Sequence, residues 1–278
     1  MQSVDMNTNT PMGIQGVVFD WAGTIVDFGS LAPMGAFVEL FKAHGVPLSV
    51  AQARVPMGLP KLDHIRELGR MPQVAQAWQA QHGRAFSDAD AHSLLLSFEP
   101  MSAAAALAHS DFIPGFMDSL AWLQGKGTRV ATTTGYTRTI MRPLIAKAHA
   151  LGFAPDLVVC CDDVERSRPD PMGMHACMAA MDLTGRARCV LKVDDTAPGL
   201  AEGLNAGCWT VGVAASGNAL GWSLAQWNAA SFEERLLGAS QARARLLEAG
   251  AHEVINTVAE LPEVIARLQA RMEAGQTP

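Results

Sequence analysis

The fold class of this chain is decided by residues 13–27, GIQGVVFDWAGTIVD. The apolar run 17–19 within this segment is typical of a short strand that is buried on both faces. Asp20 ends the run, and Gly23 then allows a sharp turn. A carboxylate at the carboxyl end of a first parallel strand lies where open α/β sheets bind ligands. Judged by position alone, an aspartate that only closes a loop is an equally good interpretation.

The rest of the chain follows two patterns of hydrophobic residues. Residues 32–101 have helical periodicity with few β-branched runs, which predicts a helical insertion directly after the first strand. Further strands are predicted at 129–133, 157–161, 189–193 and 209–213, with helices between them and an edge strand at 252–255. This alternation predicts an α/β fold with a doubly wound parallel sheet and a Rossmann-like core.

The overall composition excludes several classes of protein. Hydrophobic residues make up 49% of the 278 residues, which is enough for a substantial core. The net charge is −6 without any basic run, so a nucleic-acid partner is not expected. No apolar stretch reaches the ~20 residues of a membrane span, and the polar N-terminus lacks a signal region. We therefore expect a cytoplasmic protein with a disordered tail at 1–12 and with reduced cysteines.

Polar side chains stand at the ends of four predicted strands. One polar strand end has little meaning, but four in a doubly wound pattern converge on one crevice. These residues are Asp20, Thr134, Asp162 with Asp163, and Asp194 with Asp195.

The segment DWAGT, residues 20–24, resembles the nucleophile loop of the haloacid dehalogenase-like hydrolases. Most phosphatases of that superfamily have Asp-x-Asp, in which the second aspartate protonates a leaving alkoxide. Ala22 stands in that place here, and this form is similar to that of the phosphonoacetaldehyde hydrolases, which cleave a carbon–phosphorus bond. A carbon that leaves as an enamine needs no acid on an oxygen, so the substitution has a chemical reason.

A second motif, MGLPKLDH at 57–64, resembles the phosphonatase cap motif Met-Gly-Leu-x-Lys followed by a histidine. The resemblance implies that Lys61 forms a Schiff base with the aldehyde, which requires its pKa to be depressed. His64 lies three residues further on the same helix face and could relay its proton, while Met57 could exclude water. A solvated lysine, a surface histidine and a core methionine are the alternatives for these three positions.

The same resemblance, which runs from residue 16 to about 268, assigns the domains and the remaining roles. Residues 31–109 would form a helical cap domain, and 13–30 with 110–278 the core catalytic domain. Closure of the cap is expected to use hinges near 27–33 and 110–115. Asp20 would be the nucleophile. The residues expected to hold the phosphonate or line the site are Thr134, Gly135, Tyr136 and Arg168.

Mg²⁺ is the cofactor that the resemblance implies. Its expected ligands are Asp20, the backbone carbonyl of Ala22, and Asp195. The usual superfamily motif Gly-Asp-x-x-x-Asp reads DDTAPG at 194–199, so its second aspartate has become Gly199. Either Asp194 or an ordered water could compensate for this loss at the metal. The alternative for Asp194 is a turn or helix-cap residue.

The expected reaction is hydrolysis of phosphonoacetaldehyde to acetaldehyde and phosphate, through a Lys61 Schiff base and an aspartyl phosphate on Asp20. One alternative is a Mg²⁺-dependent phosphatase of a small organophosphate, against which Ala22 argues. Another is a non-catalytic dimeric binding protein. A homodimer through the cap is also expected, because Met34, Phe37 and Phe41 form one apolar helix face.

Overall fold

The computed structural model of the chain describes residues 13–278, so the predicted tail at 1–12 lies outside the described residues. Six parallel strands form one sheet in the order β3-β2-β1-β4-β5-β6. This topology confirms the prediction of a doubly wound sheet. The strands are β1 (Gly16–Phe19), β2 (Arg129–Thr133), β3 (Val158–Val159), β4 (Val190–Asp194), β5 (Trp209–Val213) and β6 (Glu253–Ile255).

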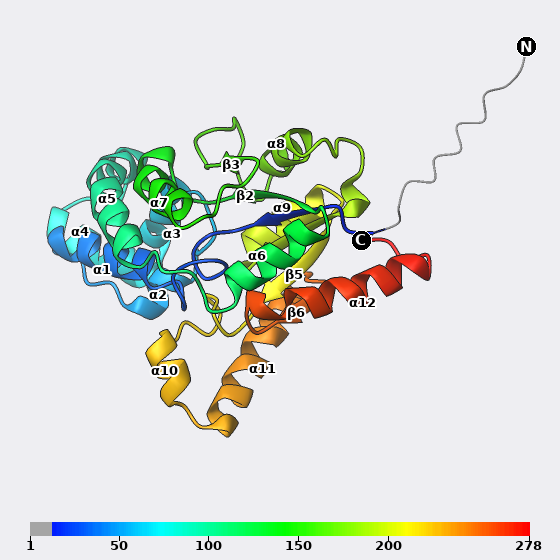
Figure 1. Cartoon of the computed structure of the whole chain (residues 1–278). Helices are drawn as coiled ribbons and strands as arrows, with labels where there is room; N and C mark the ends of the chain where they lie inside the picture. The colour runs from blue at the N-terminus through cyan, green and yellow to red at the C-terminus, as the bar shows by residue number, and fades with distance from the viewer. Residues whose placement is uncertain (1–12) are drawn as a thin grey trace, which may run out of the picture.

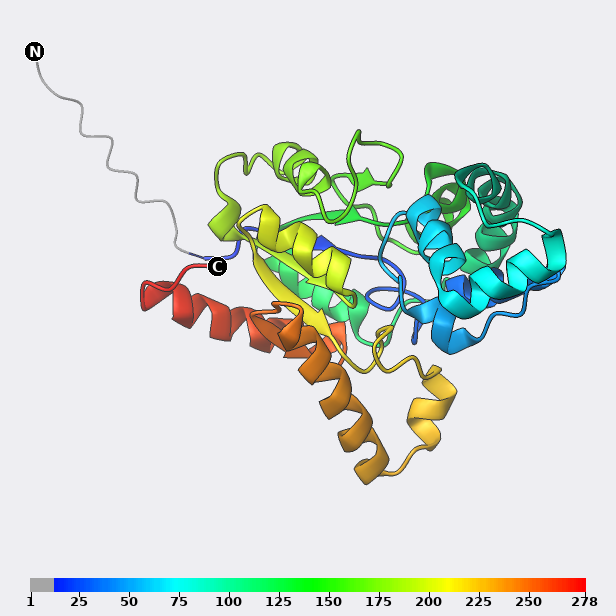
Figure 2. The same ribbon diagram turned by 180° about the vertical axis from the view of Figure 1, so that it is seen from behind.

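Strand β1 lies at the centre of the sheet and is buried on both faces, as its apolar run predicts. Phe19 packs edge-on against Phe116 of α6, with 5.7 Å between the ring centroids, whereas Val18 belongs to the cluster around α8. Figure 1 shows α6 and α12 over one face, and Figure 2 shows α8, α9 and α11 over the other. The two layers of helices therefore cover a sheet whose first strand ends in the interior at Asp20.

The first five of the six helices between β1 and β2 gather at one side of the sheet (Figure 1). They are α1 (Ala32–Ala43), α2 (Val50–Arg54), α3 (Lys61–Arg70), α4 (Pro72–His82) and α5 (Asp88–Ala108). The core helices are α6 (Phe116–Gly125), α7 (Arg138–Ala150), α8 (Met172–Ala180), α9 (Ala197–Asn205), α10 (Leu224–Ala229), α11 (Phe232–Glu248) and α12 (Leu261–Glu273). The fold is thus the expected α/β core with an inserted helical cap.

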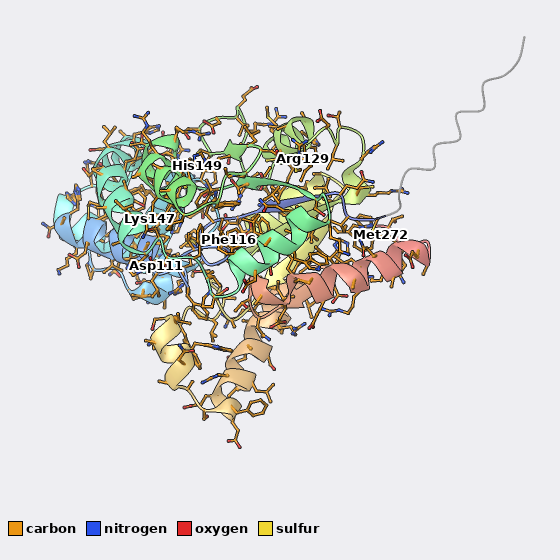
Figure 3. All side chains as sticks on the ribbon, viewed as in Figure 1. Asp111, Phe116, Arg129, Lys147, His149 and Met272 are labelled. Atoms are coloured by element: carbon orange, nitrogen blue, oxygen red, sulfur yellow. The ribbon has the colours of Figure 1, made fainter. Side chains whose placement is uncertain are left out.

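Local chemistry explains where the cap helices begin. The Ser87 hydroxyl accepts a hydrogen bond from the Asp90 backbone N–H, and the Asp90 carboxylate accepts one from the Ser87 N–H. This reciprocal capping box opens α5. The return from the cap to the core is tied to α7 by an ion pair between Lys147 Nζ and Asp111 Oδ1 at 3.2 Å (Figure 3). Asp111 lies in the second of the two predicted hinge segments, 110–115.

Two expectations need correction. The third strand was predicted over 157–161, but β3 ends at Val159 because the Asp163 carboxylate accepts the Cys160 backbone N–H at 2.7 Å. The apolar face of Met34, Phe37 and Phe41 is buried inside the chain, since Phe37 stacks on Phe98 of α5 at 4.3 Å. That face cannot form a dimer interface, so the basis of the dimer prediction was wrong. The dimer itself stays a prediction that sedimentation can test.

Among the helices of residues 13–278, none has both the length and the apolar character that crossing a bilayer requires.

Candidate active site

The cap and the core meet over the carboxyl ends of the strands, where both contribute to one small pocket. The pocket contains about 20 Å³ of solvent-accessible space, which is room for about one water molecule. Nine of the predicted site residues line it, namely Asp20, Ala22, Met57, Lys61, Thr134, Gly135, Tyr136, Arg168 and Asp195. The convergence of strand ends and cap motif that the sequence predicts is therefore present in the tertiary structure.

Two glycines allow the cap loop to lie directly on the core. A Cβ on Gly58 would lie 2.3 Å from Thr196 Oγ1, and its φ of +91° also favours glycine. A Cβ on Gly135 would lie 2.9 Å from the Leu59 carbonyl oxygen. A side chain at either position would hold the cap motif away from the strand ends.

Asp20 is buried at the end of β1 and faces a cation. Its Oδ1 lies 2.9 Å from Nη2 of Arg168. Burial, with the nearby charge of Asp194, raises the pKa of Asp20 to about 6, while Arg168 and Lys192 act in the opposite direction. With that pKa, roughly nine in ten Asp20 side chains carry the negative charge at pH 7. Asp20 is therefore available as a nucleophile.

Arg168 is held in one orientation by contacts on several sides. Its Nε donates to Glu202 Oε2 at 3.1 Å, and its Nη2 donates to the Thr133 carbonyl oxygen at 2.8 Å. Nη2 also lies 3.3 Å from Asp194 Oδ2. The surrounding carboxylates raise the pKa of Arg168 further, so the guanidinium keeps its charge although it is fully buried. The expected orientation of Arg168 toward Asp20 is present.

Three buried residues around Arg168 were not among the predicted site residues, namely Thr133, Lys192 and Glu202. Lys192 in the middle of β4 is fully buried, and its Nζ lies 2.6 Å from Thr133 Oγ1, 3.1 Å from Asp194 Oδ2 and 3.3 Å from Glu202 Oε2. Thr133 Oγ1 also donates to Glu202 at 2.7 Å. A lysine within the apolar run CVLKV, at 189–193, was the available signal, because an unpaired charge is rarely buried in a strand.

Three carboxylates at this edge of the sheet could hold a metal ion. Oxygen atoms of Asp20, Asp194 and Asp195 all lie within 4.8 Å of one another. Asp195 Oδ2 accepts the Asn218 backbone N–H at 2.6 Å, whereas its Oδ1 is buried and has no hydrogen-bond partner in the part of the chain that the structure describes. Burial and the charges of Asp20 and Asp194 raise the pKa of Asp195 well above its usual value. A cation beside Asp195 Oδ1 would relieve this repulsion.

The net charge of the surrounding network also favours a bound cation. Its four carboxylates and two cations leave a net charge of −2, which a divalent cation balances. The members are Asp20, Asp194, Asp195, Glu202, Lys192 and Arg168. An all-oxygen donor set of this kind fits Mg²⁺.

Asp194 has a positioning role that the structure makes visible. Its Oδ1 accepts hydrogen bonds from the backbone N–H of Thr196 at 3.0 Å and from the Thr196 hydroxyl at 2.7 Å. A Cβ on Gly199 would lie only 2.0 Å from Asp194 Oδ2. The Asp194 carboxylate therefore occupies the space in which a side chain at position 199 would begin. This supports the interpretation of Asp194 as a turn residue and explains why position 199 is glycine.

Lys61 is the first residue of α3 and is only 3% exposed, so the alternative of a solvated lysine was wrong. Its Nζ lies 4.7 Å from the Tyr136 ring centroid and 5.8 Å from that of Phe37. Among residues 13–278, no carboxylate lies within 4.0 Å of this ammonium group. Burial is the main cause that lowers the pKa of Lys61 to about 8, and Arg168 contributes. An amine in this setting is partly neutral near pH 7.

His64 is also buried, which excludes the surface alternative. Its Nε2 lies 2.9 Å from the Ala53 carbonyl oxygen, which can only accept, so Nε2 carries the proton. The ring stacks on Phe37 with 3.9 Å between centroids, and Nδ1 has no hydrogen-bond partner within residues 13–278. Burial and the charge of Lys61 lower the pKa of His64 well below its usual value. His64 is thus neutral, with a free lone pair on Nδ1.

Comparison with known proteins places the chain in a family. Residues 14–207 match the family model of the haloacid dehalogenase-like hydrolases. The chain is 44% identical over 265 residues to the phosphonoacetaldehyde hydrolase of Paraburkholderia xenovorans, covering 95% of this chain and 99% of that protein. It is 43% identical over 267 residues to the phosphonoacetaldehyde hydrolase of Salmonella typhi, with the same coverage. The chain belongs to the phosphonoacetaldehyde hydrolase family.

Solved structures agree with this assignment. The crystal structure of a phosphonoacetaldehyde hydrolase-like protein from Oleispira antarctica superimposes with a TM-score of 0.93 at 39% identity, covering 95% of this chain and 96% of that one. A β-phosphoglucomutase from Clostridium difficile, at 13% identity and a TM-score of 0.65 over 94% of this chain and 99% of that one, shares the fold alone. Membership of the phosphonoacetaldehyde hydrolase family makes the chain a hydrolase and excludes a non-catalytic binding protein.

Proposed function

We propose that this enzyme hydrolyses the carbon–phosphorus bond of phosphonoacetaldehyde, giving acetaldehyde and phosphate. The observation that carries the proposal is that Lys61 of the cap and Asp20 of the core line one pocket in which Ala22 replaces a general acid. An amine and a carboxylate nucleophile, without an acid for an oxygen leaving group, suit a substrate with an aldehyde next to a phosphonate.

The first step forms an imine. The neutral Nζ of Lys61 attacks the aldehyde carbon, and loss of water with uptake of one proton leaves a protonated imine that carries the phosphonomethyl group. With a pKa of about 8, roughly one lysine in ten is neutral at pH 7. His64 Nδ1 has a free lone pair, since Nε2 is bound to Ala53, but the lowered pKa of the ring means that His64 can pass on the proton that Lys61 loses and not hold it. Met57 and Tyr136 line the pocket and would limit the access of water.

The second step breaks the carbon–phosphorus bond. Asp20 attacks phosphorus, and the electron pair of the broken bond moves into the protonated imine to give an enamine on Lys61. The enamine then takes a proton on carbon. One water molecule hydrolyses the resulting imine to release acetaldehyde and free Lys61, and a second hydrolyses the aspartyl phosphate to release phosphate and free Asp20.

Charge on the phosphonate has to be neutralised before a carboxylate can approach it. Arg168 lies against Asp20 and can bind phosphonate oxygens in the same plane. Thr134 and the backbone at Gly135 line the same wall and would donate hydrogen bonds. Asp20, Asp195 and the carbonyl of Ala22 are the proposed ligands of Mg²⁺. When bound, Mg²⁺ would supply further neutralisation of the phosphonate oxygens.

The test is borohydride trapping with phosphonoacetaldehyde, followed by peptide mass mapping. We expect a stable reduced adduct on Lys61 in the wild-type chain. Lys126→Arg is a matched control, because Lys126 lies at the end of α6, far along the chain from the cap motif. In this variant, the amount of adduct on Lys61 should be unchanged. Phosphate release from p-nitrophenyl phosphate without any adduct on Lys61 would instead support the small-organophosphate phosphatase.

A further inference from the structure

Arg54 is a cap residue whose guanidinium is bonded entirely to the core. It ends α2, and its Nη1 donates to the Gly29 carbonyl oxygen at 3.0 Å and to Asn218 Oδ1 at 2.9 Å. Its Nη2 donates to the Gly221 carbonyl oxygen at 3.2 Å. These three acceptors come from the loop after β1 and from the loop after β5, which are far apart in sequence. One cap side chain therefore joins two core loops.

The acceptor Asn218 extends this contact to the candidate metal site. Its side chain binds Arg54, while its backbone N–H donates to Asp195 Oδ2 at 2.6 Å. Asp195 is the carboxylate whose other oxygen has no partner within residues 13–278. A continuous chain of hydrogen bonds thus runs from the cap through Arg54 and Asn218 to Asp195.

The core provides a shaped seat for this guanidinium. A Cβ on Gly221, whose φ is +70°, would lie 2.6 Å from Arg54 Cζ. On the cap side, the Arg54 carbonyl oxygen accepts the Met57 backbone N–H at 3.1 Å, and the neighbouring Ala53 carbonyl binds His64. Burial lowers the pKa of Arg54, and the carboxylates of Asp195 and Asp27 oppose this effect. The structure therefore contains both the Arg54 guanidinium and a core surface that is shaped to bind it.

We propose that Arg54 is a positioning residue that couples closure of the cap to the ordering of the Asn218–Asp195 side of the core. The proposal rests on the proposed function, in which Lys61 and Asp20 must act in one closed pocket. Closure would form the three bonds of Arg54, and these would seat the cap motif and hold Asn218 against Asp195 at the same moment. The pocket would then be complete only when the cap is shut.

The first experiment compares Arg54→Ala with the wild type in steady-state kinetics. We expect kcat/KM for phosphonoacetaldehyde to fall about 10- to 100-fold, in the range of typical coupling effects, with a raised KM. Arg54→Lys should recover part of this loss. Arg66→Ala is the matched control, because Arg66 is also a cap residue but, within residues 13–278, pairs only with Asp63 and Asp88 of the cap. It should change kcat/KM by less than about twofold.

Two readouts separate positioning from a loss of folding. A cavity of about 620 Å³ borders Arg54, so added methylguanidinium can reach the vacated seat and should partly restore Arg54→Ala but not Arg66→Ala. Asn218→Ala keeps the backbone N–H that binds Asp195 and removes only the bond to Arg54. The double variant with Arg54→Ala should therefore be little worse than Arg54→Ala alone. Fully additive losses, or an unchanged KM and kcat in Arg54→Ala, would overturn the proposal.

Hydrogen exchange measured by mass spectrometry provides a readout that needs no activity. In Arg54→Ala, amides in 53–61 and 216–222 should exchange faster than in the wild type, while those of α12 stay unchanged. Equal exchange in both segments would contradict the coupling. If the wild type neither traps an imine nor releases phosphate from phosphonoacetaldehyde, the proposed function fails, whereas faster exchange would still support the cap–core contact of Arg54.

Discussion

Two buried cations, Lys61 and Arg168, line the candidate active site, and their surroundings shift their pKa values in opposite directions. Lys61 comes from the cap and lies against the rings of Phe37 and Tyr136, and burial lowers its pKa to about 8. Arg168 comes from the core and is surrounded by carboxylates, which raise its pKa. Both side chains are almost fully buried. Because both side chains are buried, the difference between them comes from their neighbours. Aromatic rings leave Lys61 as a potential nucleophile, whereas carboxylates keep Arg168 permanently charged.

The largest effect is expected from replacing Lys61, the buried cation of the cap. Lys61→Arg keeps a positive charge but cannot form an imine, so phosphate release should fall at least about 1,000-fold, as is usual when a covalent nucleophile is lost. The measurement is phosphate release from phosphonoacetaldehyde under saturating substrate. Lys147→Arg, at a half-exposed site on α7, is the control. Substantial turnover by Lys61→Arg would refute imine chemistry.

The second largest effect is expected from removing Lys192, which belongs to the charge network around Arg168 in the core. Lys192→Met leaves Asp194 and Glu202 buried without their lysine, and such a broken buried pair should cost about 3 kcal/mol of unfolding free energy. Urea denaturation followed by circular dichroism measures this loss. Adding Glu202→Gln to Lys192→Met should recover part of it, since one excess negative charge is then removed from the network. A Lys192→Met variant as stable as the wild type would show that the network does not depend on this charge.

A smaller effect tests how space is shared between Asp194 and Gly199. Gly199→Asp forces a side chain into the Asp194 carboxylate, and such overpacking should cost about 2 kcal/mol of unfolding free energy. Combining it with Asp194→Gly empties that space but also removes a carboxylate partner of Lys192 and Arg168. The loss in the double variant should therefore be smaller than the sum of the two single losses. Denaturant midpoints of the two single variants and the double variant check this, and fully additive losses would contradict the steric account.

The smallest expected effect comes from placing a carboxylate beside Lys61, since carboxylates are the neighbours that raise the pKa of Arg168. Neutral Lys61 is the attacking form, so the trapping rate should rise with pH up to about 8 and level off above it. The Cys161 thiol lies beside Lys61, and Cys161→Asp places a carboxylate there. The carboxylate stabilises the ammonium form, so the rising limb should move up by about one pH unit and slow trapping about tenfold at pH 7. Cys161→Asn, without the charge, should leave the limb in place.

Local patterns predicted much of this fold because strands and caps depend on neighbouring residues. The apolar run before Asp20 was recognisable without coordinates, and the Ser87 capping box depends only on two residues that are three positions apart. The end of β3 was predicted too late, since Asp163 captures the Cys160 N–H in a turn that hydrophobicity does not reveal. The apolar face of α1 was assigned to a dimer because its internal partner Phe98 lies some sixty residues away in sequence.

The sequence by itself determined the chemical inventory of this protein: the DWAGT loop with Ala22, the MGLPKLDH motif with Lys61, and the acidic residues at the strand ends. These are matters of residue type and short spacing, which the covalent chain carries directly. Only the tertiary structure decided the state of each group. The proton position on His64, the lowered pKa of Lys61 and the support of Arg168 by Glu202 all depend on distant residues. Desolvation and charge act through space, and only the folded chain defines those distances.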